Sequence, residues 1–459
     1  MANPQKLGQE FQIKEATIFS ERFDDEYNIT NYVGELSFFE DLERPYVTAQ
    51  IVCMDDIGVF DEIGIRGSEK IRIEVRSVEE SLGDFGFVIV LNIVSIIQNN
   101  KVGDRSEVYH LNCISPHAYR DAMVKVSRSY TGNVDATARA VLKNHLDVDT
   151  DISYLGIVQN SSPRKVLIPY LSPLETTEWL LNSASTVSGS PLYCWQTIYD
   201  QVDGKDTVRM GTLDFMMNAP AFNEDLHLTY SAASAQSVAN KSLAEQAVAV
   251  KKLRVENIQD TLKMMHEGAI GSNLQSLDTF TSDIFDRHFS IDEALNRLET
   301  MRIVPYNSEQ NVHDSKATLT FSGETRLVSE WDGRYYNTIT SFGTYGAVNS
   351  YHDTQDQIEA LNKVRNPAVK SMFNKNMIDI TIPGVSFFAQ LGNGNSGVSV
   401  GDTVHIDFLN SDVDQDDGGV YNEDLSGKYL IHKCRNIFTN TAHEIVISIS
   451  KLATRASES

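Results

Sequence analysis

The sequence is short of long apolar runs, and this excludes one class of protein. No stretch approaches the ~18 uninterrupted apolar residues that a membrane-spanning helix needs. The longest run, FGFVIVLNIVSII (Phe85 to Ile97), is too short and is rich in β-branched residues, which predicts a buried strand. The opening residues, MANPQKLGQEF, lack the apolar core of a secretory signal. We therefore expect no membrane insertion and a chain made and kept in the cytosol.

Cysteine is also scarce, which argues against two kinds of covalent or metal framework. The 459 residues include four cysteines, Cys53, Cys113, Cys194 and Cys434, with no C-x-x-C pair among them. Such spacing is typical neither of a disulfide scaffold nor of a structural zinc site. We expect these side chains to act as small buried hydrophobic groups and expect no cofactor.

Basic residues are outnumbered: 63 Asp and Glu stand against 39 Lys and Arg, a formal net charge of −24. Tight binding to nucleic acid without sequence preference needs clusters of Lys and Arg, so this balance opposes it. With 41% hydrophobic residues, the composition is that of a globular chain, long enough for two to four domains.

The first 115 residues predict a small β-barrel or sandwich. Six strand-like segments are separated by turn signals. They are QIKEATIF, VGELSFFE, YVTAQIVCMD, SEKIRIEVRS, FGFVIVLNIVSIIQ and EVYHLNCIS.

From residue 116 to about 218 the pattern predicts a compact α/β unit. One helix is expected in TGNVDATARAVLKNHL, with Asn133 as N-cap. A second is expected in SPLETTEWLLNSAS, where Ser172 caps, Pro173 opens the helix and Glu175 completes a capping box. PLYCWQTIYD and VRMGTLDFMM are predicted strands.

The next part of the chain predicts less regular structure. Residues 231–250 fit a loop or a surface helix, and KKLRVENIQDTLKMMHEG fits a strand or a helix that ends near Gly268. An insertion follows, with a helix capped by Ser290 and Glu293. A further helix is expected from Thr354, with Pro367 kinking its end, before a final β region.

The two ends of the chain share a pattern, which predicts an internal repeat. RGSEKIRIEV (Arg66 to Val75) and VGDTVHIDFL (Val400 to Leu409) each place a glycine ahead of an alternating apolar strand. Each is followed by a long hairpin, and the distances from Gly67 to Ser115 and from Gly401 to Ser450 are 48 and 49 positions. We interpret this as one β module used twice.

Known catalytic motifs do not emerge, so we expect no enzyme. Neither G-x-S-x-G nor G-x-x-x-x-G-K-[ST] occurs. HEGAI at His266 lacks the second histidine of a zinc protease. GNGNSG (392–397) matches a dinucleotide fingerprint but opens no expected helix, which favours a turn. His432 and His443 are placed so that they could face each other across the last hairpin, where a structural pair is the simpler interpretation.

One loop carries a weak metal candidate. In DVDQDDGGVYNE the residues Asp412, Asp414, Asp416 and Glu423 fall at calcium-loop positions. The required glycine is replaced by Asp417 and no flanking helices are expected, so a solvated loop is favoured.

The last hundred residues resemble a known family. RNPAVKSMFN, MIDITIPG, VSVGDTVHIDF and LSGKYLIHKCRNIFTNTAHEIVISISKL follow one another as in the closing module of baseplate hub proteins from contractile-tailed, T-even-type bacteriophages. SRSYTGNVDATARAVLKNHL and, more faintly, GAIGSNLQSLDTFTSDIF extend the likeness. These hubs are related to the base of VgrG-type spikes.

The resemblance implies an α+β, β-dominated fold with two tube-like β-barrel domains of one topology. We expect the first at 1–115, an α/β middle domain at 116–218, the second barrel at 219–268 and 354–459, and an inserted domain at 269–353.

The resemblance also implies a function: a homotrimeric ring of six barrels in the virion tail baseplate, assembled in the host cytoplasm. It would join a tail tube or tube-initiator protein above to the central spike below, hold the tape measure protein, and let DNA pass without specific binding. An acidic channel wall would favour that passage. A tail-associated peptidoglycan hydrolase and an acidic β-rich host binding protein remain the alternatives, and the mass in solution discriminates among them.

Overall fold

A computed structural model of the protein describes residues 11–451 with internal gaps. The residues outside the description are 1–10, 23–25, 57, 68, 78–85, 102–105, 159–163, 203, 224–226, 231–247, 256–265, 267, 269–270, 279–281, 283, 291–317, 322, 328–333, 341–352, 375–376, 385–396, 410–425, 440–441 and 452–459. Among the described residues no helix has the length and apolar character to cross a membrane.

The N-terminal region contains all six strands that the sequence predicts, together with short connecting elements. They are β1 (Phe11–Phe19), β2 (Tyr27–Asn28), η1 (Thr30–Tyr32), β3 (Val33–Asp41), β4 (Thr48–Asp55), α1 (Val59–Ile63), β5 (Lys70–Ser77), β6 (Gly86–Lys101) and β7 (Glu107–Ile114). Buried and partly exposed residues alternate along β4 and β7, because successive side chains of a strand point to opposite faces.

The second repeated region is assembled from three separate stretches of the chain. Its strands are β14 (Leu228–Tyr230), β15 (Lys252–Val255), β21 (Ile378–Pro383), β22 (Thr403–Phe408), β23 (Gly427–Thr439) and β24 (His443–Ser450). The terminal hairpin, which the sequence predicts to repeat an earlier one, is formed by β23 and β24.

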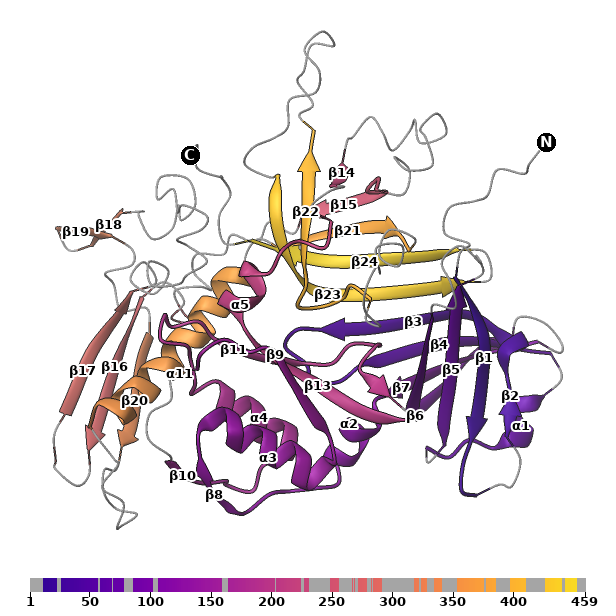
Figure 1. The fold of residues 1–459 in the computed structure, drawn as a ribbon, viewed down its shortest axis with the longest axis horizontal. Coiled ribbons are helices and arrows are strands. Elements are labelled where there is room, and N and C mark those ends of the chain that lie inside the picture. The colour runs from indigo at the N-terminus through magenta and orange to yellow at the C-terminus, as the bar shows by residue number, and fades with distance from the viewer. Residues whose placement is uncertain are drawn as a thin grey trace, which may run out of the picture.

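Both regions lie in one 13-stranded sheet. Its order is β15-β21-β24-β23-β3-β4-β7-β6-β5-β1-β2, with β22 pairing β14 and β23. The yellow hairpin of the C-terminus therefore lies beside the indigo strand β3 near the N-terminus (Figure 1).

The two regions use the same strand pairing. β5 pairs with β6, β6 with β7, β7 with β4 and β4 with β3, and the counterparts β22, β23, β24, β21 and β15 pair in the same order. The register of the long hairpin shifts between Ile93 and Ser95 in one region and between Ile431 and Lys433 in the other. A shared order with a shared bulge supports the predicted repeat.

The expectation of two separate β-barrels is not met in the described residues, which contain no closed barrel. β23 pairs with β3 over seven residue pairs, from Lys433 with Asp41 to Thr439 with Glu35. The second region therefore continues the sheet of the first instead of closing on itself. The expected domain boundaries remain a prediction.

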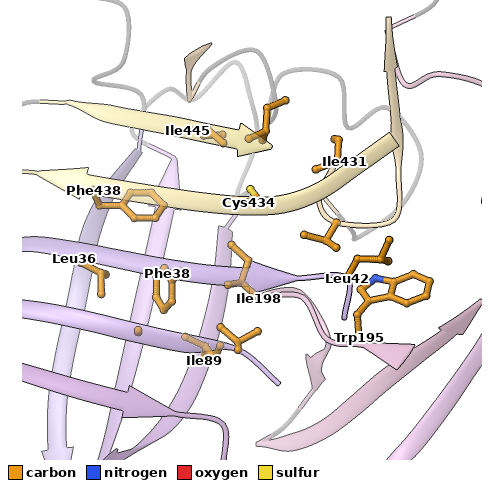
Figure 2. Packing of buried hydrophobic residues seen from close by; sticks show 14 of the residues in the cluster. Leu36, Phe38, Leu42, Ile89, Trp195, Ile198, Ile431, Cys434, Phe438 and Ile445 are labelled. Atoms are coloured by element: carbon orange, nitrogen blue, oxygen red, sulfur yellow. The ribbon is translucent and has the colours of Figure 1, made fainter. Parts of the chain in front are cut away.

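One hydrophobic core joins the two regions and part of the chain between them. Leu36 and Phe38 of β3, Ile89 of β6 and Phe438 of β23 converge beneath the sheet (Figure 2). The rings of Phe38 and Phe438 meet edge to face, with centroids 6.2 Å apart. Such pairs add about 1 kcal/mol to the gain from apolar burial.

Residues 116–218 form a mixed unit with its own smaller core. Its elements are α2 (Pro116–Asp121), β8 (Ser129–Gly132), α3 (Val134–Leu146), β9 (Asp149–Tyr154), β10 (Arg164–Leu167), α4 (Pro173–Leu181), β11 (Leu192–Trp195), β12 (Gln201–Val202), β13 (Lys205–Thr212) and α5 (Leu213–Asn218). The predicted capping box of Ser172 and Glu175 is present. The prediction of one strand for VRMGTLDFMM is wrong in its second half, since α5 begins at Leu213.

The inserted region contains two small sheets in its described part. They comprise β16 (Gly271–Asp278), β17 (Ile284–Ser290), β18 (Thr318–Phe321), β19 (Glu324–Leu327) and β20 (Arg334–Thr340). Ser290 ends β17, and the helix expected after it, with Glu293, lies outside the described residues, so that helix and its cap stay a prediction.

The long helix α11 (Asp353–Asn374) leads into the second repeat and docks on the middle unit. It contains Pro367 and continues to Asn374, and the expected kink at the proline stays a prediction. The amides of Asn362 and Asn366 donate to the carbonyl oxygens of Ser183 (3.1 Å) and Ala184 (2.7 Å), just after α4. These amides therefore fix α11 to the segment that follows α4.

Candidate functional site

The seam between the two repeats, where β23 meets β3, is held by charged side chains on the exposed face of the sheet. Arg435 Nη2 lies 3.4 Å from Glu35 Oε1, and the guanidinium lies 5.1 Å from the Phe39 ring centroid. Lys433 and Asp41 form a looser pair at 3.8 Å. Exposed ion pairs contribute under about 1 kcal/mol each, so the buried face and the ladder of backbone hydrogen bonds supply most of the cohesion.

A buried carboxyl group ties three parts of the chain together beneath this seam. Glu40 of β3 accepts the backbone N–H of Ile198 at 2.6 Å, and the hydroxyl of Ser399 donates to its other oxygen. Burial raises the pKa of Glu40 to about 7, while these two donors oppose the rise. The residue therefore links the first repeat, the middle unit and the second repeat.

A second buried polar group lies next to it. Arg209 of β13 donates to Asp200 from Nε (2.9 Å) and Nη2 (2.8 Å). The Tyr154 hydroxyl donates to Asp402 at 3.1 Å, and burial raises the pKa of that carboxyl. Each charge is paired or hydrogen-bonded, which is the condition for keeping charged groups inside a protein.

A turn at Gly401 brings the start of the second repeat close to the middle unit. Gly401 adopts φ +91°, and a Cβ there would lie 2.5 Å from Cζ2 of the buried Trp195. Gly67, the matching glycine of the first repeat, adopts φ +94° with no atom within 4 Å of such a Cβ. The same turn is therefore used twice, once in open space and once against an aromatic ring.

One buried group contains the three residue types of a catalytic triad, Ser115, His117 and Asp206. Its hydrogen bonds are not those of a triad. His117 Nδ1 lies 3.0 Å from Asp206 Oδ2, and its Nε2 donates to the Pro45 carbonyl oxygen at 2.6 Å. The Ser115 hydroxyl donates to Gln196 Oε1 at 2.6 Å. A triad needs a hydrogen bond between the nucleophile and the base. Here both ring nitrogens are engaged elsewhere, so the arrangement fastens α2 to β13.

Apart from the short outer strands β2 and β14, the sheet has further parts with a neighbour on one side only within the described residues, and we call two of them the open edges. Beyond Ile93, β6 pairs with β7 alone within the described part of the chain, and β15 pairs there with β21 alone. Ile96 points to the core side of β6 but stays 37% exposed, whereas Cys434, its counterpart in β23, is covered by β3 and is 2% exposed. An apolar edge without a neighbour is a site for pairing with another strand.

The metal candidates from the sequence, Asp412, Asp414, Asp416 and Glu423, lie outside the described residues, as does nearly all of GNGNSG. The four cysteines are buried and free, as expected.

The predicted meeting of His432 and His443 across the hairpin is wrong. His443 is paired in register with Phe438, and its ring stacks on that phenyl ring at 4.1 Å. His432 lies at the bulge, near Phe373. The register shift at the bulge and the length of β23 separate the two imidazoles.

The sequence interpretation missed a different histidine cluster, formed by His227, His405 and Asp407. These are the only described residues that form a group of three potential metal ligands. The local signal was His-x-Asp in β22, which places both side chains on one face of the strand. The third member, His227, immediately precedes β14, which pairs in parallel with β22, and lies 178 positions before His405. No local pattern reveals this partner.

Comparisons with known proteins place the fold. No family model and no curated protein match the sequence. The structure is similar to that of a tail protein from Neisseria meningitidis MC58, with a TM-score of 0.52, 9% identity and coverage of 96% of this chain and 97% of that chain.

Two further structures have lower scores. The tail protein of prophage MuSo2 from Shewanella oneidensis gives a TM-score of 0.48 at 12% identity, over 95% of this chain and 98% of that one. A type VI secretion component from Escherichia coli gives 0.40 at 8% identity, over 98% and 79%. At these sequence identities the likeness concerns the fold alone. We base the fold comparison on the first structure, whose TM-score is above 0.5. The chain therefore shares the fold of the tail protein from Neisseria meningitidis.

Proposed function

We propose that this chain is the structural hub of a phage tail baseplate. Three copies form a ring that joins the sixfold tail tube, or its initiator, to the threefold central spike and surrounds the path of the tape measure protein and DNA. The fold of a tail protein supports this role. The observation that carries it is the sheet: its inner seam and its two open edges are built from corresponding strands.

The seam within one chain supplies the pattern for contacts between chains. Four strands of the second repeat (β15, β21, β24, β23) and four of the first (β3, β4, β7, β6) lie side by side in matching order. The seam joins β23 to β3. The counterpart of β23 is β6 and the counterpart of β3 is β15, and these are the two open edges. A second copy of the chain can therefore continue the sheet by placing its β15 against β6.

The matching registers specify this contact. In the seam, Ile437 lies opposite Ser37. Equivalent residues follow from the strand registers counted from the shared bulge. Ile437 of β23 corresponds in this way to Asn99 of β6. Ser37 of β3 corresponds to Arg254 of β15. The proposed contact between copies therefore places Asn99 of one chain opposite Arg254 of the next.

A head-to-tail contact of this kind closes into a ring when the rotation from one copy to the next is a whole-number fraction of a full turn. If the contact between copies repeats the geometry of the seam, each chain supplies two equivalent steps. Three chains then supply six, which matches a sixfold tube above and a threefold spike below. This symmetry gives a physical reason for one chain to contain the module twice.

We assign the exposed face of the eight-stranded part to the channel. Its charged residues, among those described, are as often basic as acidic: Glu35, Asp41, Asp379 and Glu444 against Lys252, Arg254, Lys433 and Arg435. The acidic excess expected from the net charge is therefore not found on this face. A balanced wall would still avoid the basic clusters that hold phosphates by counterion release.

The mass of the purified chain in solution tests the ring. We expect about three times the 51.3 kDa of one chain by light scattering at micromolar concentration. Ile96→Lys, which places a charge at the open edge of β6, should shift the population to single chains. Val88→Lys is the matched control, because Val88 is also 37% exposed but lies where β6 already pairs with β5. A single-chain mass for the unaltered protein, or equal behaviour of the two variants, would contradict the proposal.

A further inference from the structure

The cluster formed by His227, His405 and Asp407 has the geometry of a metal site. His405 and Asp407 lie two residues apart in β22, and their side chains share one face. β14 runs parallel to β22 with Leu228 opposite Ile406, which brings the preceding His227 beside His405. Two segments 178 residues apart in sequence therefore place two imidazoles and one carboxylate together.

The distances are close to those that one metal ion would impose. His227 Nδ1 lies 2.8 Å from Asp407 Oδ2, and His405 Nε2 lies 3.7 Å from Asp407 Oδ1. All three candidate ligand atoms lie within 4.8 Å of one another. Zinc binds nitrogen and oxygen at about 2.0–2.2 Å, so its ligand atoms in a tetrahedral site are roughly 3.4 Å apart. Small side-chain rotations would bring the three donors to that separation.

Hydrogen bonding alone accounts for only part of this arrangement. The His227 contact is a hydrogen bond, but 3.7 Å from His405 is too long for one. The two rings stack with centroids 3.7 Å apart and planes 9° apart, and each directs one nitrogen toward the same carboxylate. Stacked imidazoles repel each other if both are protonated, whereas neutral imidazoles are the forms that bind metals.

The backbone around the cluster is held firmly. The amide of Asn223 donates to the His405 carbonyl oxygen (2.8 Å), and its oxygen accepts the His405 backbone N–H (2.7 Å). Lys428 lies opposite His405 in β23, and its ammonium donates to the carbonyl oxygen of Ala219. The ligand frame is therefore fixed on both sides, and the lysine opposite His405 is engaged outside the cluster.

We propose that His227, His405 and Asp407 bind one divalent transition-metal ion, with zinc the best fit to two imidazoles and a carboxylate. The His227, His405 and Asp407 side chains are 33%, 31% and 15% exposed, which leaves room for a water as fourth ligand. The ion would tie the chain after α5 to β22 of the second repeat. This inference does not depend on the proposed ring.

Zinc binding by the full chain, purified without a histidine tag, tests the site. We expect one zinc per chain after dialysis, measured by elemental analysis, and a saturable rise in Tm with zinc but not with magnesium. His405→Gln should lower zinc affinity by at least about tenfold. His110→Gln, at a partly buried histidine of β7, is the matched control and should leave affinity unchanged.

A measurement on the unaltered protein protects this test against a variant that fails to fold. Co²⁺ in place of zinc should give the ligand-field absorption of a tetrahedral site with nitrogen and oxygen donors, and zinc should displace it. Absence of saturable binding, or full binding by a folded His405→Gln variant, would overturn the proposal and leave the His227–Asp407 hydrogen bond as the role of the cluster.

Discussion

At the scale of single residues, two glycines perform the same backbone task in different surroundings. Gly67 and Gly401 precede corresponding strands and share a positive φ, which side chains with a Cβ rarely adopt. Only Gly401 also faces a neighbour, the buried Trp195. The first constraint is local, and the second comes from the packing of the middle unit against the second repeat.

Alanine substitutions separate these two constraints. Gly67→Ala should lower the free energy of unfolding by about 1–3 kcal/mol through backbone strain alone. Gly401→Ala should cost roughly 1–3 kcal/mol more, because its Cβ would overlap the Trp195 ring. Thermal unfolding of both variants and the unaltered chain measures the difference. Equal losses would show that Trp195 moves aside at no cost, against our account of this contact.

Residue-scale features were predictable where they are local. The capping box of Ser172 and Glu175 follows from four adjacent letters, and the structure contains it. The partners of Glu40 do not follow in this way, since Ile198 and Ser399 lie 158 and 359 positions away. The histidine cluster was missed for the same reason. Without an alignment of related sequences, only the fold reveals such pairs.

At the scale of elements, strands with a strict period of two were predicted well. An error came where one segment contained a junction between a strand and a helix. In VRMGTLDFMM the strand ends at Thr212 and a helix begins, because Leu213 and Met216 turn into the core as one helical face.

The hairpin of β23 and β24 differs from its counterpart in burying two imidazoles. Burial lowers the pKa of both His432 and His443 to about 3. A histidine with a lowered pKa in the folded state stabilises the fold above its unfolded pKa of about 6.5. That contribution is lost as the pH falls from 6.5 toward 3, because the unfolded chain takes up protons first. We therefore expect acid to weaken the second repeat.

His443→Gln tests this pH dependence. The glutamine amide can replace the imidazole Nε2 that lies 3.2 Å from Asn436 Oδ1, but it does not titrate. Between pH 6.5 and 4 the variant should lose at least about 1 kcal/mol less stability than the unaltered chain. The comparison is thermal unfolding across that pH range. Parallel curves for the two proteins would rule out His443 as a source of acid sensitivity.

At the scale of the whole molecule, the repeat becomes a statement about assembly. The sequence indicated one module used twice, and the matched pairings and bulges support it. The sequence did not reveal that the modules share one sheet, because the seam between β3 and β23 joins residues about 400 positions apart. Closed barrels were expected where the described chain instead leaves open edges.

The net charge of −24 is likewise a property of the whole chain and not of one face. Ion pairs across the seam place a cation beside Glu35 and another beside Asp41, so the exposed sheet near the seam is balanced. Total charge fixes how the protein behaves in solution, but the strand register decides which charges reach a given surface.

The central claim is that a second copy of this chain continues the sheet from β6 to β15 in the register of the inner seam. Engineered disulfides test it directly, since directly opposed residues on paired strands have Cα atoms about 4.5–5.5 Å apart, within reach of a disulfide. The double variant Asn99→Cys with Arg254→Cys should form bonds between chains on mild oxidation. The matched control, Ser37→Cys with Ile437→Cys, places cysteines at the corresponding pair of the seam and should form its bond within one chain.

The measurement is the covalent mass of both double variants after oxidation, by mass spectrometry under denaturing, non-reducing conditions. Our account predicts a closed species of three chains for the first variant, returned to single chains by reduction, and a single oxidised chain for the control. Each single cysteine substitution should give no such trimer. Single chains from the first variant, while the control oxidises fully, would contradict the proposed ring.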